Sequence, residues 1–359
     1  MSDRSERSKR LALNGSMDQA MDREVGRGDW APDRGRQAGP VRTRWAAGIV
    51  NHGSYDDLDR CLESLARQSF PAPAIAVYDT GEDPVRFHAE RAAHSGLFFE
   101  SGPNRGYAGG ANRVVERLAR EAAPLDYILV LNPDVELDSD FALRLIEGIE
   151  GRPRVAIATG KLLRPDRRTL DSAGIYFPRH GRPRDRGSDM PDHGQFDTAE
   201  LVEAASGAAM MLRVAALDDL ALEGELFDES FFAYHEDTNL CWRARRFGWQ
   251  ILYEPRAIAV HVRGWQRGRR AEIAISTRRH SFKNHYLQFV KNETLGHGRR
   301  NLPWLLGWEI LRFGFVVLRD RSMLGAYAEA WRALPEARRK RALVKARARR
   351  LANWTDSKT

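Results

Sequence analysis

Short apolar runs alternate with helical patterns along the chain from residue 45 onward. Ala46–Asn51, Ile75–Asp79 and Tyr127–Leu131 have the composition of buried strands, and Leu97–Phe99 is a shorter run of the same kind. Helical spacing of apolar residues fills the stretches between them, as from Gly106 to Leu118. This repetition predicts an α/β fold with a doubly wound, mostly parallel sheet covered by helices on both faces. Ligands of such sheets bind in the crevice at the carboxyl ends of the strands.

Charge is distributed unevenly along the 359 residues, whose net charge is +8. Residues 45–262 carry 24 basic and 35 acidic side chains, whereas residues 263–359 carry 23 basic and 7 acidic ones. An acidic body therefore precedes a basic C-terminal third, and the basic third is the part suited to a polyanionic partner. Because 42% of the residues are hydrophobic, the chain can bury one large core or two modest ones, which excludes wholesale disorder.

The N-terminal segment and the cysteines bear on the compartment. Residues 1–44 mix Arg, Asp, Gly and Ser without an apolar run, so they predict a disordered leader and not a secretory signal. Cys61 and Cys241 lie too far apart for a metal-binding spacing and do not form a disulfide framework. We therefore expect a protein of a reducing compartment, the cytoplasm.

Two further segments stand out by composition. Arg164–Gln195 is rich in Arg, Pro, Gly, Asp and His, and predicts a long mobile loop inserted into the fold. Leu302–Leu318 is apolar but is interrupted by Glu309 and Arg312, which favours a surface-lying amphipathic helix over a membrane span. A polybasic stretch, Arg338–Arg350, follows it.

Acidic residues recur where strands end. Asp79 follows one strand, Asp134 follows another within Asn132-Pro133-Asp134, and Glu236-Asp237 precede a helix. A carboxylate in this position can accept a hydrogen bond from a base or ribose, or bind a divalent cation that bridges a diphosphate. His261, at the end of the strand-like run 257–260, is a candidate to complete the shell of that metal.

Each of these residues also has a plain structural interpretation. Asp is common at strand ends and helix starts because it caps, and a strand-end histidine can simply form a local hydrogen bond. The glycine-rich segment Asn104–Asn112 can bring backbone close to a sugar or phosphate. It lacks the dinucleotide-binding spacing and the P-loop lysine, which weighs against NAD and ATP as ligands.

Nine motifs in a fixed order resemble those of family 2 glycosyltransferases, and the chain is most similar to their rhamnosyltransferase-like branch. The motifs are Asn51-His52, Asp79, Asn104–Asn112, Asn132-Pro133-Asp134, Ser206-Gly207-Ala208, Phe227–Phe232, His235-Glu236-Asp237, Gly248-Trp249 and His261. The resemblance covers residues 45–295 and implies a GT-A fold with a nucleotide-binding crevice, followed by a helical extension at 296–359. It further implies a nucleotide-diphosphate-sugar donor, Mg²⁺ or Mn²⁺, and inversion at the anomeric carbon.

The resemblance also implies a role for individual residues. Asp237 would be the catalytic base, and Asp134 and His261 the metal ligands. Asp79 would contact the donor's pyrimidine base, and Glu236 and Trp249 the acceptor. The remaining donor-binding candidates are Asn51, Asn104, Gly106, Asn112 and Asn132. For the nearby aromatic residues Phe231, Phe232, Tyr234, Trp242 and Trp249, core packing is the competing interpretation.

Three departures from the family pattern keep an alternative open. Thr80-Gly81-Glu82-Asp83 replaces the usual Asp-Asn-x-Ser continuation, Asn239 replaces a second aspartate, and Asn132 replaces the first aspartate of the metal motif. The chain could therefore be a nucleotide-binding or scaffold protein of this fold that has lost catalysis. A nucleic-acid-binding role for the basic tail is disfavoured because the tail lacks interleaved aromatic residues.

The basic third suits phosphate groups at a membrane. Six arginines follow His261 closely, and arginine's forked donors suit phosphates. These are Arg263, Arg267, Arg269, Arg270, Arg278 and Arg279. Together with the apolar and polybasic segments, they predict a peripheral enzyme on the inner face of the cell membrane. The expected acceptor is a saccharide, in particular a polyprenyl-linked one, in cell-surface polysaccharide synthesis. The branch resemblance favours dTDP-rhamnose as donor, with UDP-galactofuranose or another UDP-hexose as the alternative.

Overall fold

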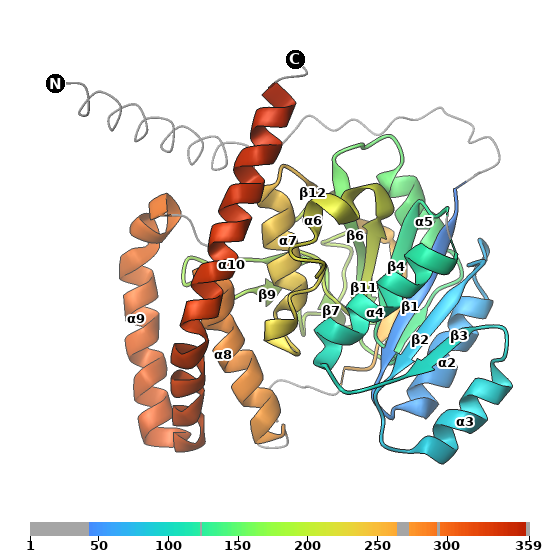
Figure 1. Ribbon diagram of the computed structural model, residues 1–359, viewed down its shortest axis with the longest axis horizontal. Coiled ribbons are helices and arrows are strands. Elements are labelled where there is room, and N and C mark those ends of the chain that lie inside the picture. Colours follow the sequence, from blue (N-terminus) through green and yellow to red (C-terminus); the bar gives the residue numbers. More distant parts are fainter. Residues whose placement is uncertain (1–42, 123, 264–272, 293–294, 357–359) are drawn as a thin grey trace.

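The computed structural model describes residues 43–122, 124–263, 273–292 and 295–356. Its main sheet has the strand order β10-β12-β6-β11-β4-β1-β2-β3, with β5 and β7 pairing at the side of this path. Helices lie on both faces of the sheet (Figure 1). The α/β architecture expected from the alternating apolar runs is confirmed. The disordered leader predicted for residues 1–44 lies almost wholly outside the described residues.

The first half of the sheet is parallel. β4 pairs with β1, β1 with β2, and β2 with β3, all in parallel. The strands are β1 (Trp45–Asn51), β2 (Ile75–Asp79), β3 (Phe98–Ser101) and β4 (Tyr127–Leu131), and the helices between them are α2 (Tyr55–Ala66), α3 (Pro84–Ala93) and α4 (Gly106–Glu121). Every residue of β1 and β4 is buried, as expected for strands covered on both faces. Their carboxyl ends form one edge of the sheet.

The second half mixes directions. β11 is antiparallel to both β4 and β6, and β12 is parallel to β6. The elements here are β5 (Val135–Leu137), α5 (Phe141–Ile149), β6 (Val155–Leu163), β10 (Glu200–Leu201), β11 (Ala209–Arg213), α6 (Leu217–Leu220), α7 (Glu236–Arg246) and β12 (Gln250–His261). β5 pairs with the end of β12, with Val135 opposite His261. This pairing brings the residues that follow β4 next to the carboxyl end of β12.

The segment Arg164–Gln195 is not the mobile loop that its composition predicts. It contains β7 (Leu170–Ser172), β8 (Ile175–Tyr176) and β9 (Arg184–Asp185), and β7 pairs with β6. Leu170 and Asp171 are fully buried. The expectation is wrong because this segment is fixed mainly by short strand pairs and ion pairs, which leave no long apolar pattern in the sequence.

Three long helices follow the sheet and stand together beside the α/β body in Figure 1. They are α8 (Ile275–Asn292), α9 (Leu295–Arg319) and α10 (Leu324–Asp356). α9 contains the helix expected at 302–318. The domain boundary expected at 295 stays a prediction; α9 begins at Leu295, and α8, which precedes it, packs along α10. Arg300–Arg319 is long and apolar enough to cross a membrane, and 6% of that window is buried.

Candidate active site

Asp134 and His261 lie side by side where β4 and β12 end. The distance from His261 Nε2 to Asp134 Oδ1 is 3.4 Å, and the Val262 N–H donates to the Asp134 carbonyl at 3.0 Å. The His261 side chain is almost fully buried. The antiparallel pairing of β5 with β12 is what brings these two residues together, although they are more than 120 positions apart in the sequence.

Asp171 holds the other ring nitrogen of His261. Its Oδ2 lies 2.7 Å from His261 Nδ1, and its Oδ1 lies 3.1 Å from Arg164 and 3.5 Å from Arg263. Burial lowers the pKa of His261, but the two carboxylates outweigh it and raise that pKa to about 9. The sequence analysis missed Asp171 because it lies in the supposed loop, although the apolar positions Leu170, Ala173 and Ile175 around it hinted at a buried strand.

These residues fit a divalent metal ion. A carboxylate oxygen and an imidazole nitrogen that share one ion at about 2.1 Å each lie roughly 3 Å apart. The observed 3.4 Å between Asp134 Oδ1 and His261 Nε2 is close to that spacing. A carboxylate on the distal nitrogen of a histidine, as Asp171 provides, is the usual support of a metal-binding imidazole.

Glu236 and Asp237 open helix α7 and are held differently. Asp237 Oδ2 accepts the Gly207 N–H at 2.9 Å, and Oδ1 accepts the Thr238 N–H at 2.6 Å. Glu236 is 6% exposed, and its Oε2 has no hydrogen-bond partner among the described residues. Burial raises the pKa of both carboxyls, and the charge of Asp237 raises that of Glu236 further. Asp237 is thus oriented by backbone donors, whereas one carboxylate oxygen of Glu236 is buried without a hydrogen-bond partner among the described residues.

Backbone contacts connect this acidic pair to the Asp134–His261 pair. Asp237 binds the Gly207 N–H, and the adjacent Ala208 carbonyl accepts the Asn132 N–H at 2.9 Å. The Tyr107 hydroxyl donates to the Gly207 carbonyl at 2.8 Å. Burial raises the pKa of Tyr107, and the charges of Glu236, Asp237 and Asp134 raise it further. Tyr107 therefore lies near all three carboxylates, a position that the sequence analysis did not recognise within the glycine-rich segment.

The backbone just before Glu236 is strained and is held from outside. Phe232, Tyr234 and His235 all have positive φ, at 65°, 71° and 72°. Asn284 of α8 is fully buried, and its Nδ2 lies 2.7–2.8 Å from the carbonyls of Phe231, Ala233 and Tyr234. A side chain from the C-terminal helices thus fixes the turn that presents the acidic pair.

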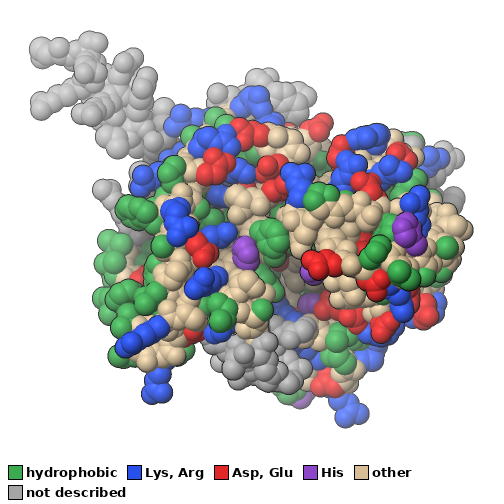
Figure 2. Space-filling view, turned by 60° about the horizontal axis from the view of Figure 1, so that its bottom comes forward, with side chains coloured by type: hydrophobic (Ala, Val, Ile, Leu, Met, Phe, Trp, Pro, Cys, Tyr) green, Lys and Arg blue, Asp and Glu red, His purple; other side chains and the backbone are tan. Residues whose placement is uncertain are grey.

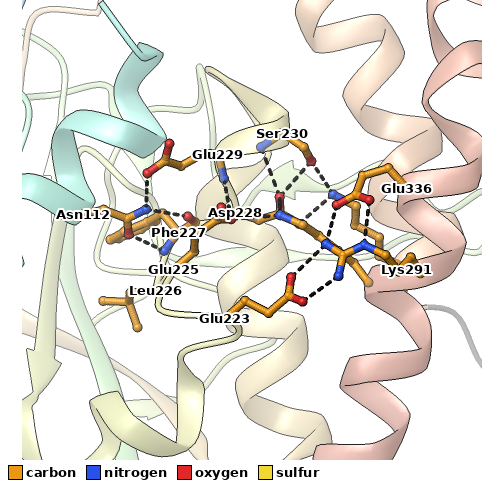
Figure 3. Close-up of polar contacts among 12 residues, drawn as sticks. Asn112, Glu223, Glu225, Leu226, Phe227, Asp228, Glu229, Ser230, Lys291 and Glu336 are labelled. Carbon is orange, nitrogen blue, oxygen red and sulfur yellow. Dashed lines mark hydrogen bonds and ion pairs between the residues drawn. The ribbon is translucent and has the colours of Figure 1, made fainter. Parts of the chain in front are cut away.

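A buried ionic hub centred on Asp228 fastens the same loop (Figure 3). Asp228 Oδ2 accepts from Lys291 of α8 at 2.6 Å, and Oδ1 accepts from Lys340 of α10 at 2.7 Å. Ser230 donates both its N–H and its hydroxyl to Oδ1. Burial alone would raise the pKa of Asp228, but the two ammonium groups hold it far below its usual value. The helical extension is therefore part of the site's framework.

The donor-side candidates Asn51 and Asp79 meet at the ends of β1 and β2. Asn51 Nδ2 and the Tyr55 hydroxyl each donate to one oxygen of Asp79 at 2.7 Å. Asp79 is 1% exposed, and these two hydrogen bonds tie β1, β2 and α2 together. Contact with a pyrimidine base stays a prediction. Nearby, Asn104 Oδ1 accepts the Gly106 N–H at 2.9 Å at the start of α4.

The structure does not place every candidate at this edge. Asn112 exchanges two hydrogen bonds of 2.8 Å with the backbone of Phe227 and so ties α4 to the Asp228 loop (Figure 3). Trp249 follows the far end of α7, about 16 Å of helix away from Glu236, and donates to Asp219. Its assignment to the acceptor site is therefore not supported by its position, and packing explains it.

The predicted phosphate-binding arginines are also dispersed. Arg278 pairs with Asp320 at 2.9 Å, and Arg279 donates to the Ser322 carbonyl, so both fasten α8 to the turn before α10. Arg263 pairs with Asp185 and Asp171. Arg267, Arg269 and Arg270 lie outside the described residues. Figure 2 shows a hollow in the middle of one face, with histidine side chains near its edge.

Comparison with known proteins bears on the family and the fold. The model of the family "Glycosyl transferase family 2" matches residues 47–220. The rhamnosyltransferase WbbL of Escherichia coli is 28% identical over 225 residues, which are 59% of this chain and 81% of WbbL. An N-acetylglucosaminyl-diphospho-decaprenol L-rhamnosyltransferase of Mycobacterium tuberculosis is 25% identical over 304 residues, which are 77% of this chain and 91% of the relative.

Solved structures show the same fold at low identity. The mannosyltransferase PcManGT of Pyrobaculum calidifontis, in complex with GDP-Man and Mn²⁺, aligns over 95% of each chain with a TM-score of 0.51 and 13% identity. Residues 1–349 of TarS of S. aureus in complex with UDP align over 88% of this chain and 92% of that fragment, with a TM-score of 0.50 and 14% identity. Residues 47–220 of the chain therefore match the glycosyltransferase family 2, and the fold is the GT-A fold of these solved structures.

Proposed function

We propose that this protein is a metal-dependent inverting glycosyltransferase in which Asp237 is the catalytic base. The observation that supports this most is the backbone connection between Asp237 and the Asp134–His261 pair through Gly207, Ala208 and Asn132. An acceptor hydroxyl between them loses its proton to Asp237 as its oxygen bonds to the anomeric carbon. The bond from that carbon to the donor's diphosphate breaks on the opposite face.

Each residue of the site has a defined task in this proposal. The N–H groups of Gly207 and Thr238 orient the Asp237 carboxylate. Glu236, which has one carboxylate oxygen without a hydrogen-bond partner among the described residues, contacts the acceptor. Asp134 and His261 would hold Mg²⁺ or Mn²⁺, which neutralises charge on the leaving diphosphate. Asn51, Asp79, Asn104, Gly106 and Asn132 follow the carboxyl ends of β1, β2, β3 and β4, and we assign the nucleotide-sugar to this edge of the sheet.

The sugar and the acceptor are inferred from the relatives. Two of them are rhamnosyltransferases, and one name specifies a diphospho-decaprenol acceptor. We take a dTDP-activated rhamnose as the donor, with UDP-activated hexoses as the alternative, and a polyprenyl-linked saccharide of cell-surface polysaccharide synthesis as the acceptor. Screening nucleotide-sugars by thermal shift with and without Mn²⁺ identifies the donor, since a ligand stabilises the fold it binds.

Replacement of the base tests the mechanism. Asp237→Asn should lower turnover by at least about 10³-fold with donor affinity unchanged, because the proton acceptor is lost and the donor side is intact. Asp218→Asn, an exposed carboxylate on α6, is the matched control and should keep full activity. Unchanged turnover in Asp237→Asn would exclude Asp237 as the base. A wild-type protein that binds the donor but never transfers sugar would support the non-catalytic alternative.

We further propose that α9 places the enzyme peripherally on the inner face of the cell membrane. Ile310, Leu311 and Leu318 are 71%, 71% and 78% exposed, and Trp331 of α10 is 74% exposed. Water-exposed apolar side chains beside a polybasic segment are the two signals that together anchor a protein to an anionic leaflet.

Vesicle partitioning tests the membrane proposal on the full chain. The triple change Ile310→Ser, Leu311→Ser and Leu318→Ser should reduce binding to anionic vesicles by at least about tenfold, because roughly 2 kcal/mol of burial is lost per side chain. Val85→Ser, equally exposed on α3, is the control. Equal partitioning of the triple variant and wild type would refute the proposal. Truncation near residue 301 is unsuitable because it removes Lys340 from the Asp228 hub.

A further inference from the structure

Five side chains that carry or can acquire positive charge gather beneath α9. We call this group, formed by His180, Arg182, His235, His285 and Arg312, the cationic cluster. His180 stacks on Trp308 of α9 with ring centres 4.5 Å apart, and the rings of His235 and His285 are 6.3 Å apart. Arg312 lies over the rings of Phe282 and Tyr286 at 3.9 and 5.0 Å. The turn between β8 and β9, the start of α7, α8 and α9 all contribute to it.

The turn that carries His180 and Arg182 rests directly on the helices. A Cβ atom added to Gly181 would lie 3.3 Å from Phe289 of α8 and 3.5 Å from Leu305 of α9. Gly181 has φ +74°, which glycine adopts without strain. The inserted segment 164–195 therefore supports His261 through Asp171 at one end and reaches α9 at the other.

The cluster is electropositive and has donors to spare. Burial and the charges of Arg182 and Arg312 lower the pKa of His235 to about 4 and that of His285 well below its usual value. Glu309 accepts from the Tyr286 hydroxyl at 2.5 Å and pairs with Arg312 at 3.5 Å, so it compensates part of the charge of Arg312. Gln288 Nε2 and Trp308 Nε1 are buried without acceptors among the described residues. These lowered pKa values leave His235 and His285 uncharged at neutral pH, so the charge of the cluster comes from Arg182 and Arg312. An anion bound there would accept from these guanidinium groups and from the unused donors.

The position of the cluster indicates which anion it serves. His235 immediately precedes Glu236, so the cluster adjoins the acceptor side of the site and not the Asp134–His261 pair. Trp308 and Arg312 of α9 face inward, whereas Leu306 and Ile310 on the same helix are 55% and 71% exposed. One helix thus has a lipid-compatible face and a face with anion-binding groups next to the acidic pair.

We propose that the cationic cluster binds the phosphate groups of a lipid-linked acceptor, a diphosphate ester whose chain leaves along α9. This inference rests on the proposed function and adds the acceptor's anchoring site to it. The same phosphate-ester chemistry occurs in phospholipid headgroups, which are the competing source of the ligand. The donor's own diphosphate is assigned to the metal-binding residues on the other side of Asp237.

Calorimetric titration with inorganic diphosphate tests the site. The titration is done in EDTA, so that metal-mediated binding to Asp134 and His261 is absent. Wild type should bind, and Arg312→Gln and His180→Ala should each weaken binding by at least about tenfold, as expected for the loss of a charge-assisted bond from Arg312 and of a ring N–H donor from His180. Arg319→Gln, the same change at an exposed arginine of α9, should stay within about twofold of wild type. The two variants come from different elements, so a packing defect at one of them does not decide the result.

Two further measurements separate the possible outcomes. Binding of UDP or dTDP with Mn²⁺ should be unchanged in Arg312→Gln and His180→Ala, which shows that the donor site is folded and tests the proposed function independently. Equal diphosphate affinity in wild type and both variants, or no binding by wild type, would overturn the assignment. Phosphatidylglycerol vesicles without isoprenoid provide the last comparison: if Arg312→Gln weakens vesicle binding as much as diphosphate binding, the ligand is a phospholipid headgroup and the acceptor assignment is wrong.

Discussion

Gly106 is the residue at which the start of α4, on the proposed donor side, touches the turn before Glu236, on the proposed acceptor side. It begins α4 with φ +72°, and a Cβ atom there would lie 2.1 Å from the Phe232 carbonyl oxygen. The same carbonyl accepts the Ala108 N–H at 3.1 Å. The strained turn before Glu236 therefore rests on the first turn of α4, and only a residue without a side chain allows this approach.

Gly106→Ala should separate these two surfaces. We expect a loss of about 2–4 kcal/mol of stability and a large fall in turnover, because backbone strain and a steric clash combine. Gly151→Ala is a matched control, since Gly151 has φ +78° but open space around its Cβ position. Urea unfolding of both variants isolates the clash. Equal losses in the two variants would mean that contact with Phe232 is unimportant.

The unpaired carboxyl of Glu236 has a predictable effect on stability. Burial and the neighbouring charge of Asp237 raise its pKa, so the folded protein binds a proton at a higher pH than the unfolded chain does. Stability from this group is present at low pH and is lost as pH rises through the raised pKa. Glu236→Gln should therefore add about 1 kcal/mol at pH 8 and less at pH 5. Urea unfolding at both values, with the exposed Glu63→Gln as control, checks this, and a gain that is independent of pH would contradict it.

At the scale of elements, α8 and α10 clamp a single loop. Lys291, Lys340 and Asn284 reach residues 228–234 from these two helices. Burial lowers the pKa of Lys291 to about 8 despite its bond to Asp228. The cost of burying these charges is offset only while all partners are present, which makes the clamp cooperative.

Asp228→Ala, which removes a partner of Lys340 of α10, should destabilise the fold far more than loss of the surface ion pair of the neighbouring Arg339. It leaves the buried ammonium group of Lys291 without a carboxylate and that of Lys340 with Glu225 alone, which costs about 3–5 kcal/mol. Glu223→Ala removes the exposed partner of Arg339 and should cost less than about 1 kcal/mol. Glu223 is labelled beside the hub in Figure 3. Chemical unfolding of the two variants gives the comparison. Similar losses would show that the hub is no stronger than a surface pair.

The sheet was predictable from sequence because its strands are marked by apolar side chains. β2 and β4 have the bounds that their apolar runs indicate. The strands of the insertion at 164–195 were not predictable. Asp171 is buried there by pairing with Arg164 and His261, and charged residues of this kind are typical of surfaces. Asn284 is likewise a polar residue within a helix, and its role depends on a loop 50 positions away. Long-range polar contacts of this kind leave no periodic signal.

At the scale of the whole molecule, the unequal charge of the two parts predicts that vesicle binding depends on salt more strongly than donor binding does. The basic third, with 23 basic and 7 acidic residues, is the part proposed to meet an anionic leaflet. Because exposed charges are screened as salt rises, vesicle binding should weaken several-fold between about 0.05 and 0.5 M salt. Donor affinity, held by buried groups and a metal ion, should change much less. Parallel sedimentation and calorimetry measure both, and equal salt dependence would contradict the division of roles.

The bond between Lys340 and Asp228 also sets an order for biosynthesis. The two residues are 112 positions apart, so Asp228 is synthesised long before the lysine that completes its pairing. At about 5–20 residues per second, the loop before Glu236 waits roughly 6 to 22 s for its last support. A nascent chain with a finished sheet therefore still lacks the last support of the loop before Glu236, which forms only when Lys340 of α10 has left the ribosome.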